Sequence, residues 1–539
     1  MALATPDKQQ ALWQALAATR DKCNSVTLRQ RFAAQPGRAA QFSAELGPLF
    51  VDYSKHHLDA EIHQKLIALA ENADIHRKLA ALRAGEACNN TEQRSANYAA
   101  LRSWATAESS DDEGIDAMYR HMAELVASLR SGRRRSCSGK RYSHIVNIGI
   151  GGSDFGPRLF SEALNESHQS AFHCHFLANI DPSCTHNTLR ELPADSTLFI
   201  IASKSFGTQE TLANAAAAQQ WLREQLPGQD INQQFVAITA KPEAAIALGV
   251  PSPQVLAVPD WVGGRFSVWS GFGLIVAINY GWDCFLDILR GGYEVDQHMR
   301  DSSSADMLPL TLALLDIWYR NCWGLNSQAI LPYCHRLKEL PDYLQQLFME
   351  SAGKSVDRHG QPLTVRSGGV IWGSEGTNGQ HSFHQLLHQG SDIIPCDFIT
   401  ALRAPNPIGE QQQALLANCF AQSLALMQGK TAEEIADDSP DQQSKSLAHH
   451  KAMPGNRPST TIVMDELNAR SLGCLIAFYE YRLICTSLIW DINPFDQWGV
   501  ELGKQISREL LQALDDDSQT PAVDSSTAQL LARSRQALK

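Results

Sequence analysis

The chain has 539 residues, of which 44% are hydrophobic and 19% are charged, and its formal net charge is −12. This length exceeds one ordinary core and predicts two or three domains, and the composition is typical of a globular protein. The negative charge argues against broad nucleic-acid binding, and no apolar run approaches the ~20 residues that a membrane helix needs. An anionic substrate must therefore be held by local positive charge and backbone N–H groups.

The 12 cysteines show no CxxC pair and no zinc-type spacing, and several lie in apolar runs. This usage is typical of reduced, buried thiols in a cytosolic protein. The N-terminus, MALATPDKQQALWQAL, lacks a basic segment followed by an apolar one. We therefore expect no secretory signal and a cytoplasmic location.

The first hundred residues have apolar positions at helical spacing, so residues 8–110 are predicted to be helical. An amphipathic helix over 115–130 leads to a basic loop, SGRRRSCSGKR, whose charges are interpreted as a solvated face. Residues 143–260 then alternate five short apolar runs with helical segments. That alternation predicts a parallel sheet with helices on both faces.

Residues 265–335 are predicted to be helical again. A second α/β unit follows, with strands expected in GGVIWG (368–373), DIIPCDFITAL and TTIVMDEL. The polar segment 431–460 is expected to form a loop, and the apolar run 473–490 a long buried helix. A linker over 515–527 precedes a short amphipathic helix at the end of the chain.

These patterns predict an α/β fold with four regions. We expect residues 1–112 to be a helical N-terminal region of a large domain, and 113–282 a small α/β domain. Residues 283–507 would form the large α/β domain, and 508–539 a C-terminal helical arm. Both domains would have parallel sheets at their cores.

The densest group of reactive side chains lies in residues 346–390. Glu350 follows an apolar, helix-like run, and the turn SEGTNGQ (374–380) leads to His381 at the start of a helix. Histidine is suited to proton transfer near neutral pH, so the window is typical of an active-site loop. By itself, however, it is equally typical of a glycine-rich connection in a buried sheet. His381, His384 and His388 share one helical face, but no carboxylate accompanies them and no HExxH pattern occurs, which disfavours a zinc site.

Two other segments each follow a predicted strand and open a helix. NIGIGGSDFG (147–156) suits an anion at a helix N-terminus, whereas Asp154 occupies the third glycine position of a dinucleotide fingerprint. A small phosphorylated ligand therefore fits better than a dinucleotide. SKSFGTQET (203–211) groups hydroxyls with one ammonium, which favours a phosphate cradle over an ordinary helix N-cap.

Two further stretches supply charged or polar side chains. Arg265 follows two glycines in VGGRFSVWS, so its guanidinium and the backbone can approach a ligand together and stabilise an oxyanion. Gln497 and Lys504 lie seven residues apart and would share a face if that segment were helical. A surface arginine in a turn and a solvated helix face are the ordinary alternatives.

Together these segments resemble the glucose-6-phosphate isomerase family. The resemblance extends from about residue 50 to 507 and rests on NIGIGGSDFG, SKSFGTQET, GGRFSVWS, ESAGKS with GTNGQHSFHQLLHQG, and FDQWGVELGK, in that order. It implies two α/β/α sandwich domains of the sugar-isomerase type and a homodimer with shared active sites. It also implies interconversion of glucose 6-phosphate and fructose 6-phosphate without a cofactor or a metal.

The resemblance also implies roles for individual residues. Glu350 would carry the proton between C2 and C1 of the open-chain sugar, His381 and Lys504 would open the ring, and Arg265 would face the enediolate. In the family, the histidine at the His381 position comes from the other subunit. The remaining matches are substrate-binding: Gly152, Ser153, Ser203, Lys204, Ser205, Thr208, Gly264, Gln346 and Gln497.

The sequence departs from the family pattern at four places. Ser205 and Gly207 replace threonines of the cradle, Ala352 stands where asparagine is common, and Tyr98 stands where histidine is usual. None of these changes removes a catalytic group.

Two alternatives to the isomerase remain. A non-catalytic sugar-phosphate sensor would not need the three proposed catalytic groups together. A nicotinamide-dependent dehydrogenase is disfavoured by the 149–156 loop.

Overall fold

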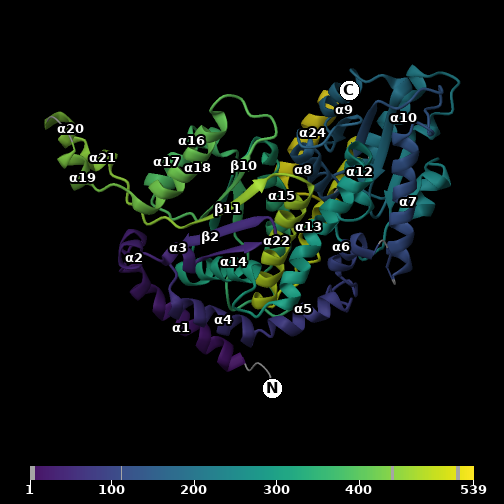
Figure 1. Ribbon diagram of the computed structural model, residues 1–539. Coiled ribbons are helices and arrows are strands. Elements are labelled where there is room, and N and C mark those ends of the chain that lie inside the picture. Colours follow the sequence, from purple (N-terminus) through teal and green to yellow (C-terminus); the bar gives the residue numbers. More distant parts are fainter. Residues whose placement is uncertain (1–5, 108, 111, 439–441, 517–521, 539) are drawn as a thin grey trace. The chain divides into compact units, whose positions relative to one another are not determined.

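The computed structural model describes residues 6–107, 109–110, 112–438, 442–516 and 522–538. The chain forms two compact units, residues 1–494 and residues 495–539. The first unit holds both β-sheets (Figure 1). The second unit consists of a short 3₁₀ turn and two helices: η10 (Trp498–Val500), α23 (Glu501–Asp515) and α24 (Ser525–Leu538).

A five-stranded parallel sheet confirms the prediction for residues 143–260. Its strand order is β4-β3-β5-β6-β7, and every neighbouring pair is parallel. The strands are β3 (His144–Ile148), β4 (His173–Leu177), β5 (Thr197–Ala202), β6 (Phe235–Thr239) and β7 (Val255–Ala257). The helices between them are α8 (Phe155–Leu164), α9 (Pro182–Leu189), α10 (Gln209–Gln225) and α11 (Pro242–Ala247). Strands β5 and β6 and all but the first residue of β3 are buried, as their continuous apolar runs require, whereas the edge strand β4 is buried only at Leu177.

The strand order reverses between β3 and β5. The chain moves outward from β3 to β4 and then returns past β3 to β5. In open parallel sheets, ligands bind outside the carboxyl ends of the strands at such a reversal. The segments 149–154 and 203–208 follow β3 and β5, so both predicted anion-binding loops start at this position.

The second sheet has six strands in the order β1-β2-β11-β10-β8-β9. Its strands are β1 (Ser43–Leu46), β2 (Leu49–Lys55), β8 (Ser327–Tyr333), β9 (Val370–Gly373), β10 (Cys396–Arg403) and β11 (Ser459–Glu466). Four of them are parallel, whereas β1 and β2 join the edge in antiparallel pairs.

The predictions that residues 8–110 and 265–335 are helical were therefore wrong at β1, β2 and β8. Leu49, Val51 and Tyr53 alternate with more exposed residues, a strand period hidden between strongly helical flanks.

Most remaining elements of the first unit are helices. The N-terminal region contains α1 (Pro6–Asn24), α2 (Leu28–Ala34), α3 (Arg38–Gln41), α4 (Ala60–Asn72), α5 (Ile75–Arg83), α6 (Tyr98–Ala107) and α7 (Glu113–Arg130). Later elements are α12 (Leu274–Tyr280), α13 (Trp282–Asp301), α14 (Leu308–Ile317), α15 (Leu340–Gln345), α16 (Gly376–Gln380), α17 (His384–Gln389), α18 (Gln411–Gln428), α19 (Ala432–Asp437), α20 (Gln442–Ser446), α21 (Ala448–Lys451) and α22 (Ala469–Trp490).

Two of the predicted loops contain short helices. Residues 376–380 form α16 within the predicted turn SEGTNGQ, and α19 to α21 occupy the segment expected to be a loop. The polar composition of both segments concealed them, since short helices bury few apolar groups. A stretch of the predicted linker, residues 517–521, lies outside the described residues.

Helix α22 confirms the predicted long buried helix and packs beside α13 (Figure 1). A Cβ on Gly473 of α22 would lie 2.1 Å from the Ile288 carbonyl oxygen, and one on Gly291 of α13 would lie 2.0 Å from the Arg470 carbonyl oxygen. The two backbones therefore meet where only glycine fits. This is the one described helix long and apolar enough to span a membrane, but 94% of its apolar window is buried within the protein, as in a core helix.

Candidate active site

The segment that carries Glu350 is a π-helical turn. Helix α15 continues into this turn, η9 (Gln346–Glu350), whose wider winding is rare and occurs frequently at functional sites. Gln346 Nε2 donates a hydrogen bond of 3.0 Å to Glu350 Oε2. The Gln346 amide thereby fixes one carboxylate oxygen of Glu350. No local sequence pattern indicated the π-helical winding of this turn.

Arg265 binds the other carboxylate oxygen. Its Nη1 lies 3.1 Å from Glu350 Oε1, with the arginine side chain 4% exposed and the glutamate side chain 25% exposed. Arg265 Nη2 also donates to the Pro494 carbonyl oxygen at 2.9 Å, and the Tyr343 hydroxyl donates to the Arg265 carbonyl oxygen at 3.2 Å. The guanidinium is therefore held in a fixed orientation beside a carboxylate that solvent still reaches.

The first glycine-rich loop contacts both of these segments. A Cβ on Gly152 would lie 2.1 Å from the Gly264 carbonyl oxygen, so the two backbones touch. Ser267 Oγ donates to the Gly152 carbonyl oxygen at 3.1 Å. Gly151 has φ +59, and a Cβ there would lie 3.1 Å from Gln346 Nε2. Three segments far apart in the sequence thus meet at one place.

Asp154 and Ser153 end this first loop. Arg158 Nη2 binds both carboxylate oxygens of Asp154, at 2.8 and 3.0 Å. The Ser153 carbonyl oxygen accepts a hydrogen bond of 2.9 Å from Asn147 Nδ2. The acidic residue at the third glycine position is therefore one half of a local ion pair.

The second loop forms a compact turn at the end of β5. Ser203 Oγ donates to Thr208 Oγ1 at 3.3 Å, and the Gly207 backbone N–H donates to Ser205 Oγ at 3.3 Å. Phe206 has φ +47, a strained conformation for a residue with a Cβ, and its buried side chain belongs to the core of the sheet. Packing of Phe206 therefore holds the hydroxyls of the turn in place.

The electrostatics of the second loop favour an anion. Burial lowers the pKa of Lys204, and the positive charge of Arg94 lowers it further, against the opposing effects of Asp260 and Glu92. A phosphate dianion would reverse this shift, because it favours the charged ammonium. The start of the first loop also lies against the end of β5, because a Cβ on Gly149 would lie 3.2 Å from the Ala202 carbonyl oxygen.

His381 lies apart from these contacts. It follows the last residue of α16 and is exposed, and its imidazole makes no hydrogen bond within the stretches of the chain that the structure describes. His384 Nδ1 and His388 Nε2 both contact Gln422 Oε1, at 3.1 and 2.9 Å. The three histidines therefore do not share one helical face as predicted, because His381 precedes α17. Among the described residues, no group of three potential ligands could hold a metal ion.

The second unit carries the two remaining predicted residues. Gln497 precedes the turn η10, and Lys504 lies in α23. The two would share a helical face only if the whole segment were helical, and Gln497 lies outside the helix. Lys504 is exposed and its Nζ lies 2.8 Å from Glu501 Oε1.

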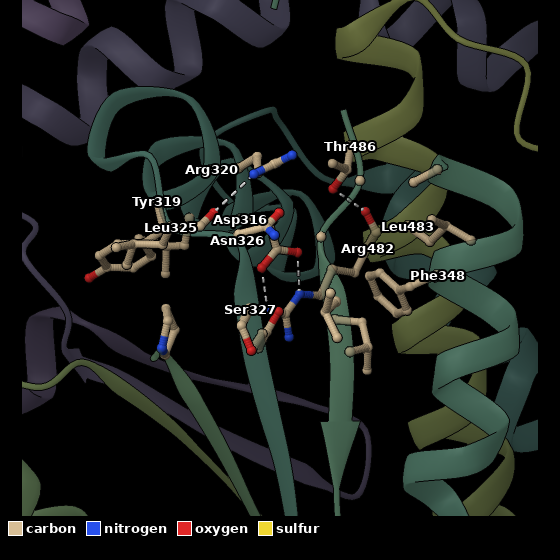
Figure 2. Close-up of a pocket in the computed structure, with 18 of the residues that line it drawn as sticks. Asp316, Tyr319, Arg320, Leu325, Asn326, Ser327, Phe348, Arg482, Leu483 and Thr486 are labelled. Carbon is tan, nitrogen blue, oxygen red and sulfur yellow. Dashed lines mark hydrogen bonds and ion pairs between the residues drawn. The ribbon is translucent and has the colours of Figure 1, made fainter. Parts of the chain in front are cut away.

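A cavity of about 60 Å³ lies beside the π turn (Figure 2). Phe348 and Ala352 line it, whereas Glu350, between them in sequence, does not. Its polar wall includes Arg482, whose Nε donates to Asp316 Oδ2 at 2.7 Å. The residues that line it include none from 149–154 or 203–208, so the cavity is separate from the two predicted anion-binding loops.

Sequence reasoning missed three residues that fix or influence the proposed site residues. The Tyr343 hydroxyl and the Pro494 carbonyl fix Arg265, and Arg94 lies close enough to Lys204 to affect its pKa. Each lies outside the motifs. A buried tyrosine in an apolar helix gives no local signal of the long-range contact that it makes.

Comparisons with known proteins match nearly the whole chain. The family model described as phosphoglucose isomerase matches residues 52–531. A glucose-6-phosphate isomerase of Pseudomonas aeruginosa is 44% identical over 531 residues, which cover 96% of each chain. One from Saccharophagus degradans is 42% identical over 533 residues, covering 98% of this chain and 97% of its own.

The fold matches as well. The crystal structure of a glucose-6-phosphate isomerase from Chlamydia trachomatis superposes with a TM-score of 0.84 at 30% identity, and the match covers 100% of both chains. A hypothetical protein from Thermus thermophilus gives a TM-score of 0.55 at 26% identity, covering 76% of this chain and 94% of its own.

Proposed function

The chain belongs to the phosphoglucose isomerase family, and we propose that it interconverts D-glucose 6-phosphate and D-fructose 6-phosphate. The reaction moves a hydrogen between C2 and C1 of an open-chain hexose phosphate through a cis-enediol or enediolate. It needs a base over two adjacent carbons, positive charge for the enediolate oxygen, and a holder for the phosphate. It would serve both glycolysis and gluconeogenesis.

The ion pair between Glu350 and Arg265 is the observation that carries the proposal. A carboxylate beside a fixed guanidinium, at 3.1 Å, supplies the base and the charge stabilisation in one place. As Glu350 takes the proton from C2, negative charge develops on the substrate oxygen, and the guanidinium is already oriented to receive it. Preorganised donors of this kind contribute on the order of 10²–10³-fold in rate.

The phosphate would be held by the two loops at the reversal of strand order. We assign Ser203, Lys204, Ser205 and Thr208 to the phosphate, with Gly152 and Ser153 contributing from the first loop. Gly264, Gln346 and Gln497 would contact the sugar. Remote phosphate binding would hold the two reacting carbons near Glu350. In this proposal residues 113–282 form the phosphate-binding domain and 283–507 the catalytic one, between the N-terminal region 1–112 and the arm 508–539.

Ring opening is assigned to His381 and Lys504. Both side chains are exposed, which suits groups that act on a substrate held by other segments. We propose a homodimer in which His381 reaches the active site of the other subunit. The chemistry is proton transfer within one substrate, so the proposal includes no cofactor, metal, nucleic acid or membrane. The 12 free cysteines are compatible with a cytoplasmic location.

A coupled assay tests the activity. Purified protein is given fructose 6-phosphate, and the formation of glucose 6-phosphate is followed by its enzymatic oxidation, with and without a metal chelator. We expect turnover that the chelator leaves unchanged. Absence of turnover in folded protein would overturn the proposed activity, and loss of turnover with the chelator would overturn the metal-free mechanism.

A further inference from the structure

Tyr98, the first residue of α6, contacts the arginine loop on both sides of Arg265. Its ring stacks on that of Phe266, with centroids 4.5 Å apart and an interplanar angle of 14°. Its hydroxyl oxygen would lie 2.8 Å from a Cβ placed on Gly263, and the Gly263 backbone makes a hydrogen bond to the phenol oxygen. The side chain thus spans a short segment whose middle residues, Gly264 and Arg265, belong to the active site.

The same two segments are joined by a second contact. Arg94 Nη2 lies 3.2 Å from Asp260 Oδ2, so the chain just before α6 is paired with the chain just before the arginine loop. Helix α6 is itself fixed to the core, since Arg102 Nη1 donates to the buried Glu480 Oε2 at 2.7 Å. Tyr98 therefore extends from a rigid support to a glycine-containing loop.

The arginine loop is a single 3₁₀ turn, Gly264–Phe266, with a second glycine before it, so contacts with other segments contribute to its position. Gly263 and Gly264 lack side chains, and glycine backbones are conformationally permissive. Gly264 must stay in contact with Gly152, and the Arg265 guanidinium must stay 3.1 Å from Glu350. A misplacement of about 1 Å at a reacting group can reduce the rate on the order of 100-fold.

We propose that Tyr98 is a positioning residue that holds the Gly263–Phe266 segment so that Arg265 meets the enediolate. This inference rests on the proposed isomerase function. Its ring and its hydroxyl have separate roles: the ring fixes Phe266, and the phenol oxygen fixes Gly263. A tyrosine that only filled the core would need the ring but not the oxygen.

The substitution Tyr98→Phe separates the two roles, because it keeps the ring and removes the oxygen. We expect kcat to fall about 10-fold, a loss smaller than that of an oxyanion donor itself, with the KM for fructose 6-phosphate within about twofold. Affinity for a hydroxamate analogue of the enediolate should fall in parallel with kcat, whereas affinity for inorganic phosphate should stay unchanged.

The matched control is Tyr280→Phe, which removes another buried hydroxyl, one that donates to the Ser161 carbonyl oxygen at 2.6 Å. It should leave kcat and the affinity for the hydroxamate unchanged. Thermal unfolding of each variant shows whether the protein remains folded. An inactive wild-type enzyme would refute the isomerase function itself. An active wild type with an unchanged kcat in Tyr98→Phe, or with equal losses in both tyrosine variants, would refute the positioning role alone.

Discussion

The proposed catalytic groups differ in how firmly the fold holds them. Arg265 and Glu350 lie in the first unit, bind one another, and are fixed by Gln346, Tyr343 and a backbone carbonyl. His381 is exposed at the end of a five-residue helix, and Lys504 is exposed on α23, where its Nζ is paired with Glu501. Groups that stabilise charge during a reaction gain from being fixed in advance, since no reorganisation is needed.

Glu350 and Arg265 are thus fixed by packing within one chain, whereas His381 and Lys504 are left exposed. The proposed base and the arginine proposed to face the enediolate are brought together by contacts within residues 1–494. The imidazole of the proposed ring-opening histidine makes no hydrogen bond among the described residues, which is compatible with the proposed role in the active site of a second subunit. Substitutions at individual groups test that division.

The largest effect is expected from Glu350→Gln. The amide keeps the size of the side chain but cannot accept the proton, so kcat should fall on the order of 10²–10⁴-fold. Affinity for inorganic phosphate should remain, since the proposed cradle, residues 203–208, belongs to another loop and the amide keeps the size of the Glu350 side chain. The coupled assay measures the first quantity and calorimetry the second. Glu162→Gln, which alters a surface carboxylate paired with Lys338, is the control and should keep full activity. A Glu350→Gln enzyme with near-normal turnover would contradict the assignment.

The next effect tests whether the site is shared between subunits. His381→Ala should lower kcat on cyclic substrate by about 10²-fold, as expected for loss of an acid–base group. If His381 serves the other subunit, a mixed dimer of Glu350→Gln and His381→Ala chains contains one intact site. Unfolding and refolding an equal mixture should then recover about a quarter of wild-type activity, because half of randomly paired C2 dimers are mixed. Recovery no greater than the sum of the two separate variants would place His381 in its own subunit's site.

A smaller effect is expected at the phosphate loop. Lys204→Met removes the ammonium and keeps the aliphatic chain, so the KM for fructose 6-phosphate should rise about 10-fold or more, the value of a charge-assisted hydrogen bond. Steady-state kinetics measures the rise in KM, and calorimetry should show a matching loss of affinity for inorganic phosphate. Lys241→Met, at an exposed lysine beyond β6, serves as the control. Unchanged phosphate affinity in Lys204→Met would remove Lys204 from the cradle.

Substitution of His57 is expected to have the smallest effect on activity at neutral pH. It should have a clear effect on the stability of the protein in acid. Burial lowers the pKa of His57 from 6.5 to about 4. In the unfolded chain the His57 imidazole is therefore protonated below pH 6.5, whereas in the folded protein it is protonated only below about pH 4. Stability should fall as the pH drops through this window, by about 3 kcal/mol from this one group.

Denaturant unfolding at pH 7, 5.5 and 4 measures this loss. It should be smaller in His57→Gln than in the wild type, whereas replacement of the exposed His359 by glutamine should leave it unchanged. Acid inactivation that precedes unfolding would instead indicate titration in the active site. An unchanged pH slope in His57→Gln would refute the role of the buried histidine.

The five-stranded sheet was predictable from the sequence, because its strands are continuous apolar runs separated by helices. Strands β1 and β2 were not, since their short alternating pattern lies between helical segments and the pairing of β2 with β11 joins residues some four hundred positions apart. The site motifs were recognisable because they place small, polar or charged residues beside strands and turns. The pairing of Arg265 with Glu350 and the π turn could not be foreseen, since both depend on long-range packing rather than on local composition.

Solvent exchange during turnover is the sharpest test of proton transfer by Glu350. If this carboxylate carries the hydrogen between C2 and C1, wild-type enzyme in heavy water should incorporate deuterium at the transferred position of the hexose phosphate, as seen by proton NMR. Glu350→Gln should incorporate none on the same timescale while still binding phosphate. Deuterium incorporation by Glu350→Gln at the wild-type rate would contradict this mechanism, since another group would then be moving the proton.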